Sequence, residues 1–345
     1  MPIIEQIPGR TIVIDGEQWL YFSGTSYLGI SALPAFRELL QESIEQYGTN
    51  YGGSRLANIQ FKAFLDAEAL LANLSGAPAA LTVSSGTLAA NWVMQHLQAQ
   101  AHPIYYAPEV HPALHWNQRP TSHSRKDWEQ KIIEKAKQER TPAILISNGI
   151  DPLRVKAYDF SWLTQLPNDI SYTLVIDDSH VFGVLGEAGG GSFRLLNLPD
   201  NVQLIVVGSL GKAWGIPGGV ILADQRFIAD LRQSSLFGGA SPAIPAYLDA
   251  FVHAQDLYAR QRIRLKENIR LFTAMLGERQ PFSQIPAFPV FYSPDQQLAR
   301  KLEQKRILIS SFPYPSPDSE LITRIVLNAL HRDGDLSRLV AAIFS

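Results

Sequence analysis

Residues 174–180 read Leu-Val-Ile-Asp-Asp-Ser-His, and residues 204–213 read Leu-Ile-Val-Val-Gly-Ser-Leu-Gly-Lys-Ala. Each stretch begins with a continuous apolar run and ends in polar residues. Such short runs, separated by helical or irregular segments, are typical of strands buried on both faces of a parallel sheet. Further runs of this kind occupy residues 80–83, 104–106, 143–146 and 220–223. The sequence therefore predicts an α/β fold with a mostly parallel central sheet in a large domain.

The regions before and after this sheet predict a hairpin and helices. Residues 11–14 and 19–22 are β-rich runs on either side of Asp15-Gly16, which is a hairpin pattern. Apolar side chains at helical spacing predict helices at residues 35–47 and 61–74. The same spacing at residues 243–276 predicts either one long helix or two joined helices.

A smaller α+β unit is predicted after this helical region. Its expected strands are residues 287–292, 306–309 and 322–327, and its expected helices are residues 296–304 and 336–343. The chain is therefore predicted to have three parts. Residues 1–45 form a hairpin and a helix that pack with the small domain, residues 46–250 form the large domain, and residues 251–345 form the small C-terminal domain.

Length and composition exclude several classes of protein. The 345 residues suggest about two domains. The chain has no cysteine, which excludes disulfides, thiolate nucleophiles, Cys-ligated zinc and iron–sulfur clusters. A net charge of −2 provides no basic excess for a nucleic-acid backbone. No apolar run is long enough to span a membrane and no signal-peptide pattern begins the sequence, so we expect a cytoplasmic protein.

Lys212 follows an apolar strand and a Gly-Ser pair, and two functional interpretations compete for it. A phosphate-binding P-loop requires a glycine where this chain has Val206 and a serine or threonine where it has Ala213, so that pattern fails. A lysine crowded by apolar residues at a strand end can instead have a lowered pKa and act as an amine nucleophile. The alternative is a solvent-exposed loop lysine.

Asp177, Asp178 and His180 follow the run at residues 174–176. Ligands of α/β folds bind outside the carboxyl ends of the strands, where these side chains are expected. Adjacent residues of a strand point to opposite faces, so one aspartate should face the site and the other should not. A metal site and a polar turn without function both remain alternatives at this point.

Three further segments are candidates for ligand binding, each with a simpler alternative. Residues 84–87, Ser-Ser-Gly-Thr, precede an Ala-rich helix start and predict either an anion site or ordinary N-capping. Residues 47–56 are glycine-rich and carry Arg55. Their glycines would allow the backbone to approach a ligand closely, and the alternative is a flexible loop without a ligand. His111 follows the strand expected at residues 104–106, where a loop histidine without function is the alternative.

Six motifs occur in order along the chain. They are Ser26-Tyr27-Leu28-Gly29, residues 47–56, residues 84–91, residues 175–186, residues 209–213 and residues 324–331. As a set, they resemble the α-oxoamine synthase family of enzymes that use pyridoxal 5′-phosphate (PLP). The resemblance covers almost the whole chain and implies the aspartate-aminotransferase fold, known as fold type I.

The resemblance implies how PLP would be held. Lys212 would carry the cofactor through a Schiff base, and Asp177 would pair with the pyridinium nitrogen. His111 would stack on the ring, and His180 would reach the phenolic oxygen. The phosphate would be bound by the hydroxyls and amides of Ser85, Gly86, Thr87 and Ser209.

The resemblance also implies a substrate site and a reaction. Arg324 would clamp the amino-acid carboxylate, and Ser54, Arg55 and Tyr27 are the other expected substrate contacts. The implied reaction is a decarboxylative condensation of a small, alanine-like amino acid with an acyl-CoA or another acyl thioester, in a homodimer with shared active sites. Glycine acetyl transfer, long-chain serine condensation, amino transfer, aldol cleavage and a non-catalytic PLP-fold binding protein remain alternatives.

The departures from the family pattern concern the substrate more than the cofactor. Of the paired arginines near the C-terminal end only Arg324 is present, with Ile322 at the other position. Residues 236–242 lack the family's threonine. The chain is short for the family, with little sequence before residue 11, so we expect less cover over the acyl-thioester entrance.

Overall fold

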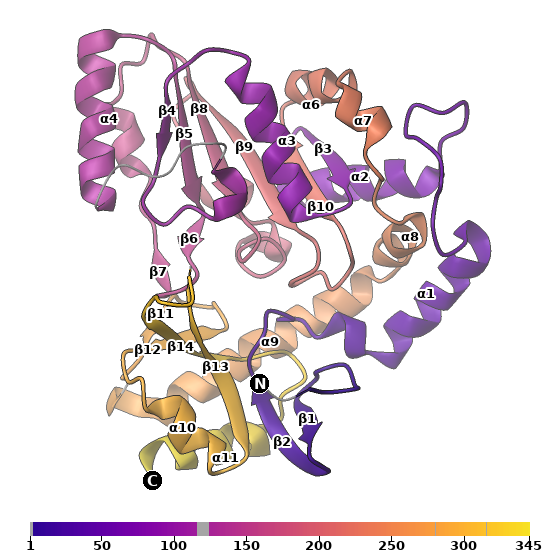
Figure 1. The fold of residues 1–345 in the computed structure, drawn as a ribbon, viewed down its shortest axis with the longest axis vertical. Coiled ribbons are helices and arrows are strands. Elements are labelled where there is room, and N and C mark those ends of the chain that lie inside the picture. Colours follow the sequence, from indigo (N-terminus) through magenta and orange to yellow (C-terminus); the bar gives the residue numbers. More distant parts are fainter. Residues whose placement is uncertain (1–2, 116–123, 280, 315) are drawn as a thin grey trace.

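The computed structural model describes residues 3–115, 124–279, 281–314 and 316–345. Within these residues, two six-stranded sheets dominate the architecture, and a two-stranded ribbon of β6 (Ile150–Asp151) and β7 (Lys156–Ala157) lies beside them. Figure 1 shows one large sheet surrounded by helices, with the second sheet below it. This agrees with the predicted α/β class.

The large sheet has the strand order β3-β10-β9-β8-β5-β4. Its strands are β3 (Ala79–Val83), β4 (Ile104–Tyr106), β5 (Ala143–Asn148), β8 (Tyr172–Asp177), β9 (Val202–Ser209) and β10 (Gly219–Ala223). Strands β4, β5, β8 and β9 pair in parallel, and their central residues are buried as the apolar runs require. All six apolar runs in the sequence are confirmed as strands of this sheet.

The sheet is mostly parallel, as predicted, and β10 is the exception. This strand pairs antiparallel with both β9 and β3. Only residues 210–218 connect β9 to β10, and the Leu210 amide closes the connection on the Gly218 carbonyl at 3.0 Å. A parallel crossover needs about a dozen residues or more, so this short connection forces the chain to reverse.

Helices pack around the large sheet. The helices α3 (Gly86–Gln98) and α6 (Gln225–Arg232) contact β10, α2 (Lys62–Ser75) contacts β3, and α4 (Arg125–Glu139) contacts β4. The helix α1 (Pro34–Tyr47) packs against α8 (Pro245–His253) and ends at Tyr47, as the predicted helix at residues 35–47 does. The helix α4 was not predicted from the sequence. Its moderate apolar face, with Trp128 and Ile132 buried, is interrupted by many charged residues.

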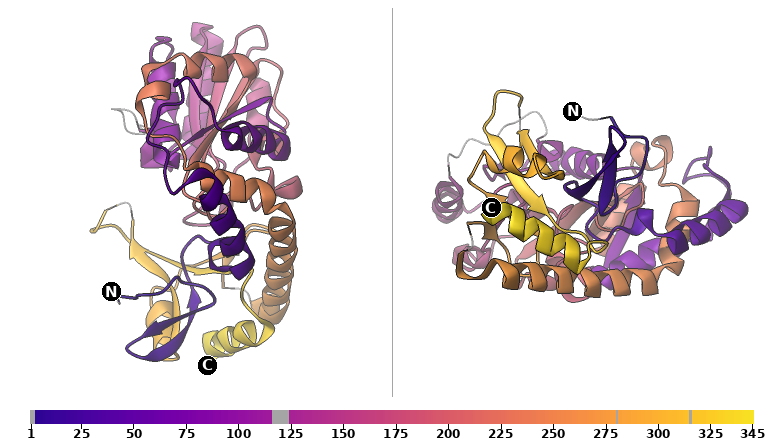
Figure 2. Two further views of the ribbon diagram at one scale, coloured as in Figure 1. Left: turned by 90° about the vertical axis from the view of Figure 1, so that its right-hand side faces the viewer. Right: turned by 90° about the horizontal axis from the view of Figure 1, so that it is seen from below.

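The second sheet combines the two ends of the described chain. Its order is β1-β2-β13-β14-β12-β11, with bounds Thr11–Ile14, Glu17–Phe22, Ile307–Pro313, Leu321–Val326, Val290–Ser293 and Ser283–Gln284. The predicted hairpin is confirmed: Asp15 and Gly16 have positive φ, as a tight two-residue turn requires. Strand β2 then pairs in parallel with β13, and Figure 2 shows these segments side by side.

Helices cover this sheet and connect it to the rest of the molecule. The predicted helical region at residues 243–276 is two helices, α8 and α9 (Gln255–Leu276), joined at Ala254. The helices α10 (Leu298–Glu303) and α11 (Asp333–Phe344) pack on β13 and α9 respectively. Strand β12 begins later than predicted, after Ala287 at a φ of 61° and Pro289. The domain limits 1–45, 46–250 and 251–345 stay a prediction.

Candidate active site

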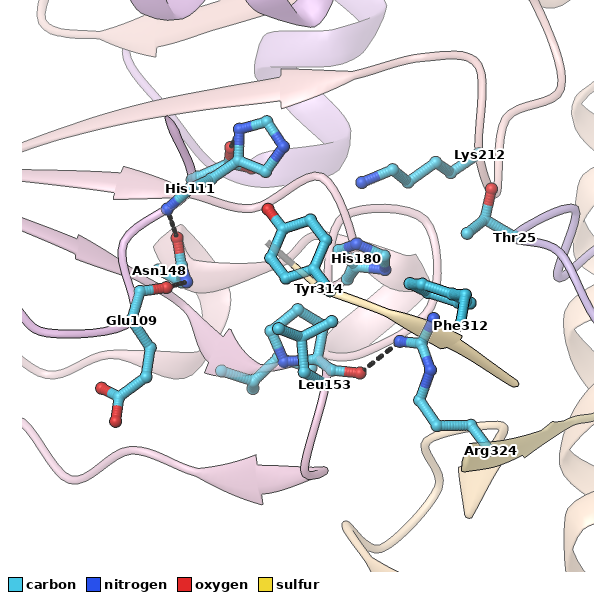
Figure 3. Close-up of a pocket in the computed structure, with 13 residues that line it drawn as sticks. Thr25, Glu109, His111, Asn148, Leu153, His180, Lys212, Phe312, Tyr314 and Arg324 are labelled. Carbon is cyan, nitrogen blue, oxygen red and sulfur yellow. Dashed lines mark hydrogen bonds and ion pairs between the residues drawn. The ribbon is translucent and has the colours of Figure 1, made fainter. Parts of the chain in front are cut away.

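A cavity of about 220 Å³ lies at the carboxyl ends of the central parallel strands. The large sheet contributes residues that end or follow β4, β5, β8 and β9, while β13 and β14 contribute from the second sheet (Figure 3). The lining residues are Thr25, Glu109, His111, Asn148, Ile150, Pro152, Leu153, Asp177, His180, Lys212, Phe312, Tyr314 and Arg324. Five predicted site residues therefore meet here, namely His111, Asp177, His180, Lys212 and Arg324.

Lys212 extends into this cavity from the connection after β9. Burial and, to a smaller extent, the charge of Arg324 lower the pKa of its amine to about 8, while Asp177 opposes this shift. A substantial fraction of the amine is therefore neutral near pH 8. This is the state in which a lysine acts as a nucleophile or accepts a proton.

Lys212 is expected to react with an amine-selective reagent at a rate that rises with pH and levels off above about pH 8. The neutral fraction of a group with this pKa grows about tenfold from about pH 7 to about pH 9. Lys62 is an internal control, since its ion pair with Asp66 at 2.8 Å raises its pKa and its reactivity should keep rising. Competitive labelling read by mass spectrometry measures both lysines, and coincident profiles would contradict the assignment.

The two adjacent aspartates point to opposite sides, as predicted. Asp177 lines the cavity, and its Oδ1 accepts a hydrogen bond from the Ser179 amide at 2.8 Å. Asp178 is buried behind it and accepts from both the amide and the hydroxyl of Ser192, each at 2.7 Å. Burial raises the pKa of Asp178 to about 7. Only Asp177 is therefore available to a ligand.

Asn148 holds the segment that carries His111. Its Oδ1 accepts from the His111 amide at 3.1 Å, and its Nδ2 donates to the Glu109 carbonyl at 2.6 Å. The His111 ring lies with its Nδ1 3.8 Å from Asp177 Oδ2. Sequence reasoning missed Asn148, although it is the last residue of β5, just as Asp177 is the last residue of β8. That position at a strand end is the signal that would have identified it.

His180 faces the cavity and is bonded from behind by Tyr27. The Tyr27 hydroxyl lies 2.7 Å from His180 Nδ1. Burial lowers the pKa of His180 well below its usual value, and Lys212, Arg324 and His111 add to this shift. The imidazole is therefore neutral at neutral pH. Tyr27, predicted as a substrate contact, is not among the residues that line the cavity, and that role stays a prediction.

Arg324 reaches the cavity from β14 of the second sheet. One of its terminal nitrogens, Nη1, donates to the Pro152 carbonyl at 2.6 Å, and its guanidinium lies 5.4 Å from the Phe312 ring centre. Its Nε is buried without a partner among the residues that the structure describes. Burial lowers the pKa of Arg324, which nevertheless keeps a positive charge. The guanidinium can therefore receive a carboxylate.

Gly86 and Ser209 approach each other at the N-terminus of α3, where Ser85 and Thr87 flank Gly86, but none of these four residues is among those that line the cavity. Ser85 caps the helix by accepting from the Leu88 amide at 3.1 Å, so N-capping is observed. The first amides of a helix have no intrahelical acceptor and favour anions. A Cβ added to Gly86 would lie 3.0 Å from the Ser209 backbone, so glycine permits this close approach. The arrangement fits a phosphate next to Lys212.

Ser54 and Arg55 are not brought to the cavity of this chain. Arg55 is buried, where it forms an ion pair with Glu68 at 2.9 Å and stacks over the Phe64 ring at 4.1 Å. The Ser54 hydroxyl donates to the Gly238 carbonyl at 2.8 Å. Their substrate role stays a prediction. Tyr314, Phe312 and Leu153 do line the cavity, but no motif singled them out.

The residues that the structure describes include no group of three or more His, Asp or Glu side chains able to hold a metal ion. None of their helices is both long enough and apolar enough to cross a membrane.

Comparison with known proteins relates this chain to a family over most of its length. The family described as aminotransferase class I and II matches residues 27–343. The 8-amino-7-oxononanoate synthase of Geotalea daltonii is 26% identical over 368 aligned positions, which cover 99% of this chain and 92% of that protein.

Solved structures share the fold. A serine palmitoyltransferase variant from S. paucimobilis, with a bound PLP–myriocin aldimine, superposes with a TM-score of 0.83 at 15% identity and covers 99% of this chain and 91% of its own. The 8-amino-7-oxononanoate synthase of Francisella tularensis gives a TM-score of 0.72 at 19% identity, covering 94% and 96% respectively. The predicted fold type I architecture is thereby confirmed.

Proposed function

The chain belongs to the aminotransferase class I and II family, and we propose that it is a PLP-dependent acyltransferase. The proposed reaction is the decarboxylative condensation of a small, alanine-like amino acid with an acyl-CoA or another acyl thioester, which the resemblance to the α-oxoamine synthase family implies. The similarity to proteins named 8-amino-7-oxononanoate synthase supports it. One observation carries the proposal: Lys212, Asp177, His111, His180 and Arg324 converge on one cavity although they come from four separate segments.

The residues present fit PLP. The Lys212 amine would bind the aldehyde carbon, Asp177 the pyridine nitrogen and His111 the ring face. The amides and hydroxyls around Ser209 and the N-terminus of α3 would hold the phosphate. When bound, PLP supplies an electron sink that makes the bonds at the amino-acid Cα easier to break.

The side chains of this cavity divide the remaining work. Arg324 presents a planar donor to the amino-acid carboxylate and orients the substrate. Lys212, with its pKa near 8, accepts the proton from Cα as a general base. Ile150, Leu153 and Phe312 give the cavity an apolar wall that limits water around the reacting atoms.

Incubation of the purified protein with PLP, one amino acid and an acyl-CoA tests the proposal. We expect visible absorbance from bound PLP, and release of both CO₂ and free CoA thiol only when alanine or a similarly small amino acid and the acyl-CoA are both present. Reactions that lack one substrate are the controls. A protein that remains colourless would favour the non-catalytic alternative. Amino transfer without thiol release would favour an aminotransferase.

We also propose a cytoplasmic homodimer in which each active site takes residues from both subunits. The Ser54-Arg55 segment supports this, because it lies outside the cavity of its own chain while Leu56 and Ile59 beside it are 63% and 56% exposed. Apolar side chains that protrude together are common at interfaces. Sedimentation of the PLP-loaded protein as an active monomer would contradict this proposal.

A further inference from the structure

Tyr27 links three distant parts of the molecule behind the cavity. Its side chain is 0% exposed, and its ring packs edge-on against Phe288 with the centroids 5.8 Å apart. Its carbonyl accepts from the Ala329 amide at 2.9 Å. Its hydroxyl lies 2.7 Å from His180 Nδ1. The phenol is therefore held in one orientation, with its polar end directed at one nitrogen of the imidazole.

We propose that Tyr27 is a positioning residue that fixes neutral His180 in the tautomer with its proton on Nε2. His180 then faces the cavity as a hydrogen-bond donor and not as an acceptor. The tautomer is set by side chains of the protein and needs no bound cofactor. Its consequence for PLP, in contrast, rests on the proposed function.

The direction of the hydrogen bond follows from a count of protons. The Tyr27 hydroxyl carries one proton, and His180 Nδ1 is its only acceptor among the described residues. If Nδ1 were protonated, the hydroxyl would have to accept, and its own proton would be buried without a partner. Buried donors without acceptors are strongly disfavoured. The hydroxyl therefore donates, and Nδ1 is unprotonated.

Both groups keep the protonation states that this arrangement needs. Burial raises the pKa of Tyr27, so it remains a phenol. Burial lowers the pKa of His180, and Lys212 after β9, Arg324 on β14 and His111 after β4 contribute to the same shift. Together with burial, they keep the pKa of His180 low and the imidazole neutral. A neutral imidazole has one proton, which must lie on Nε2.

The fixed tautomer assigns a chemical role to the cavity side of His180. Within the described chain Nε2 has no hydrogen-bond partner, and the ring lines the cavity. A donor at this point suits an oxygen that carries negative charge, such as the phenolic oxygen of PLP. Because Nε2 of His180 already carries a proton, it cannot also accept a proton from the amino-acid Cα. That task is left to Lys212.

Nitrogen NMR of the cofactor-free full chain tests the tautomer directly. The protein is labelled with ¹⁵N-histidine, and His180 is assigned from the signals lost in His180→Gln. We expect Nδ1 to resonate as an unprotonated nitrogen and Nε2 as a protonated one. In Tyr27→Phe both resonances should shift toward the average of two tautomers. The titration midpoint of His180 should also rise, because the lost bond stabilised the neutral ring.

Tyr258→Phe is the matched control. Tyr258 is equally buried, but its hydroxyl donates to the Trp214 carbonyl at 2.6 Å and does not touch His180. This variant should leave the His180 resonances unchanged, even if it lowers the unfolding temperature as Tyr27→Phe does.

Two outcomes overturn the inference. One is a wild-type His180 with its proton on Nδ1, which needs no variant to be observed. The other is a Tyr27→Phe protein with unchanged His180 resonances. Failure of the proposed function gives a different result: the predicted tautomer is present, but PLP leaves the His180 resonances unchanged and the solution colourless.

Discussion

Replacement of Lys212 by alanine is expected to abolish covalent capture of PLP and to lower the condensation rate by at least about 10³-fold. The substitution removes the amine that is placed to bind the cofactor and to accept the Cα proton. Arginine at this position should be equally inactive, because its guanidinium stays protonated and is not a nucleophile. Retained cofactor in Lys212→Ala would be non-covalent, since Asp177, His111 and the phosphate contacts are untouched.

The measurement is mass spectrometry after borohydride reduction, combined with an assay of CoA thiol release. Reduction should add the cofactor mass to Lys212 of the wild-type protein and to no residue of the variant. Lys62→Ala is the control, because it removes an exposed lysine far from the cavity lining. If Lys212→Ala kept both the mass addition and thiol release, the assigned role of this lysine would be wrong.

Asp177→Asn is expected to leave PLP bound to Lys212 but to slow hydrogen exchange at the alanine Cα by about 10²–10³-fold. Asparagine has nearly the same shape, and its Oδ1 can still accept from the Ser179 amide. It lacks the negative charge that would keep the pyridine nitrogen protonated. The cofactor would then be a weaker electron sink, although its attachment to the protein is unchanged.

Proton NMR of alanine in D₂O reports this exchange without any acyl thioester. Asp178→Asn is a control of the same chemical type at the next position. Asp178 faces away from the cavity toward Ser192, so its replacement should lower thermal stability more than the exchange rate. Equal exchange rates in wild-type protein and Asp177→Asn would refute the proposed role of Asp177.

The central sheet could be predicted because its signals are local. Continuous apolar runs are required wherever a strand is buried on both faces, and all six runs form strands of that sheet. The reversed direction of β10 was not predicted, because it depends on the length of the connection before it, which the apolar run does not encode. The helix α4 was missed because its apolar side chains are few.

The cavity was predictable only in part, because only some of its residues lie next to a local sequence signal. Asp177 ends β8, and His180 and Lys212 lie shortly after β8 and β9, so their position could be inferred from the sheet. Phe312 in β13 and Tyr314 just after this strand line the same cavity, about a hundred residues further along the chain than Lys212. Only tertiary packing brings them there. The hydrogen bond between Tyr27 and His180 likewise joins segments 153 positions apart.

The parallel pairing of β2 with β13 imposes an order on biosynthesis. Leu20 pairs with Ile307, so the second strand made by the ribosome has no neighbour on this side until almost the whole chain has been translated. Thr25 and Tyr27 follow β2, so the cavity wall they support also forms late. We therefore expect the large sheet to fold first during synthesis and the ligand site to mature last. The Leu20 amide reports on this pairing because it donates to the Arg306 carbonyl at 3.0 Å. Protection of this amide from hydrogen exchange in a ribosome-stalled chain that ends before β13 would show the opposite order.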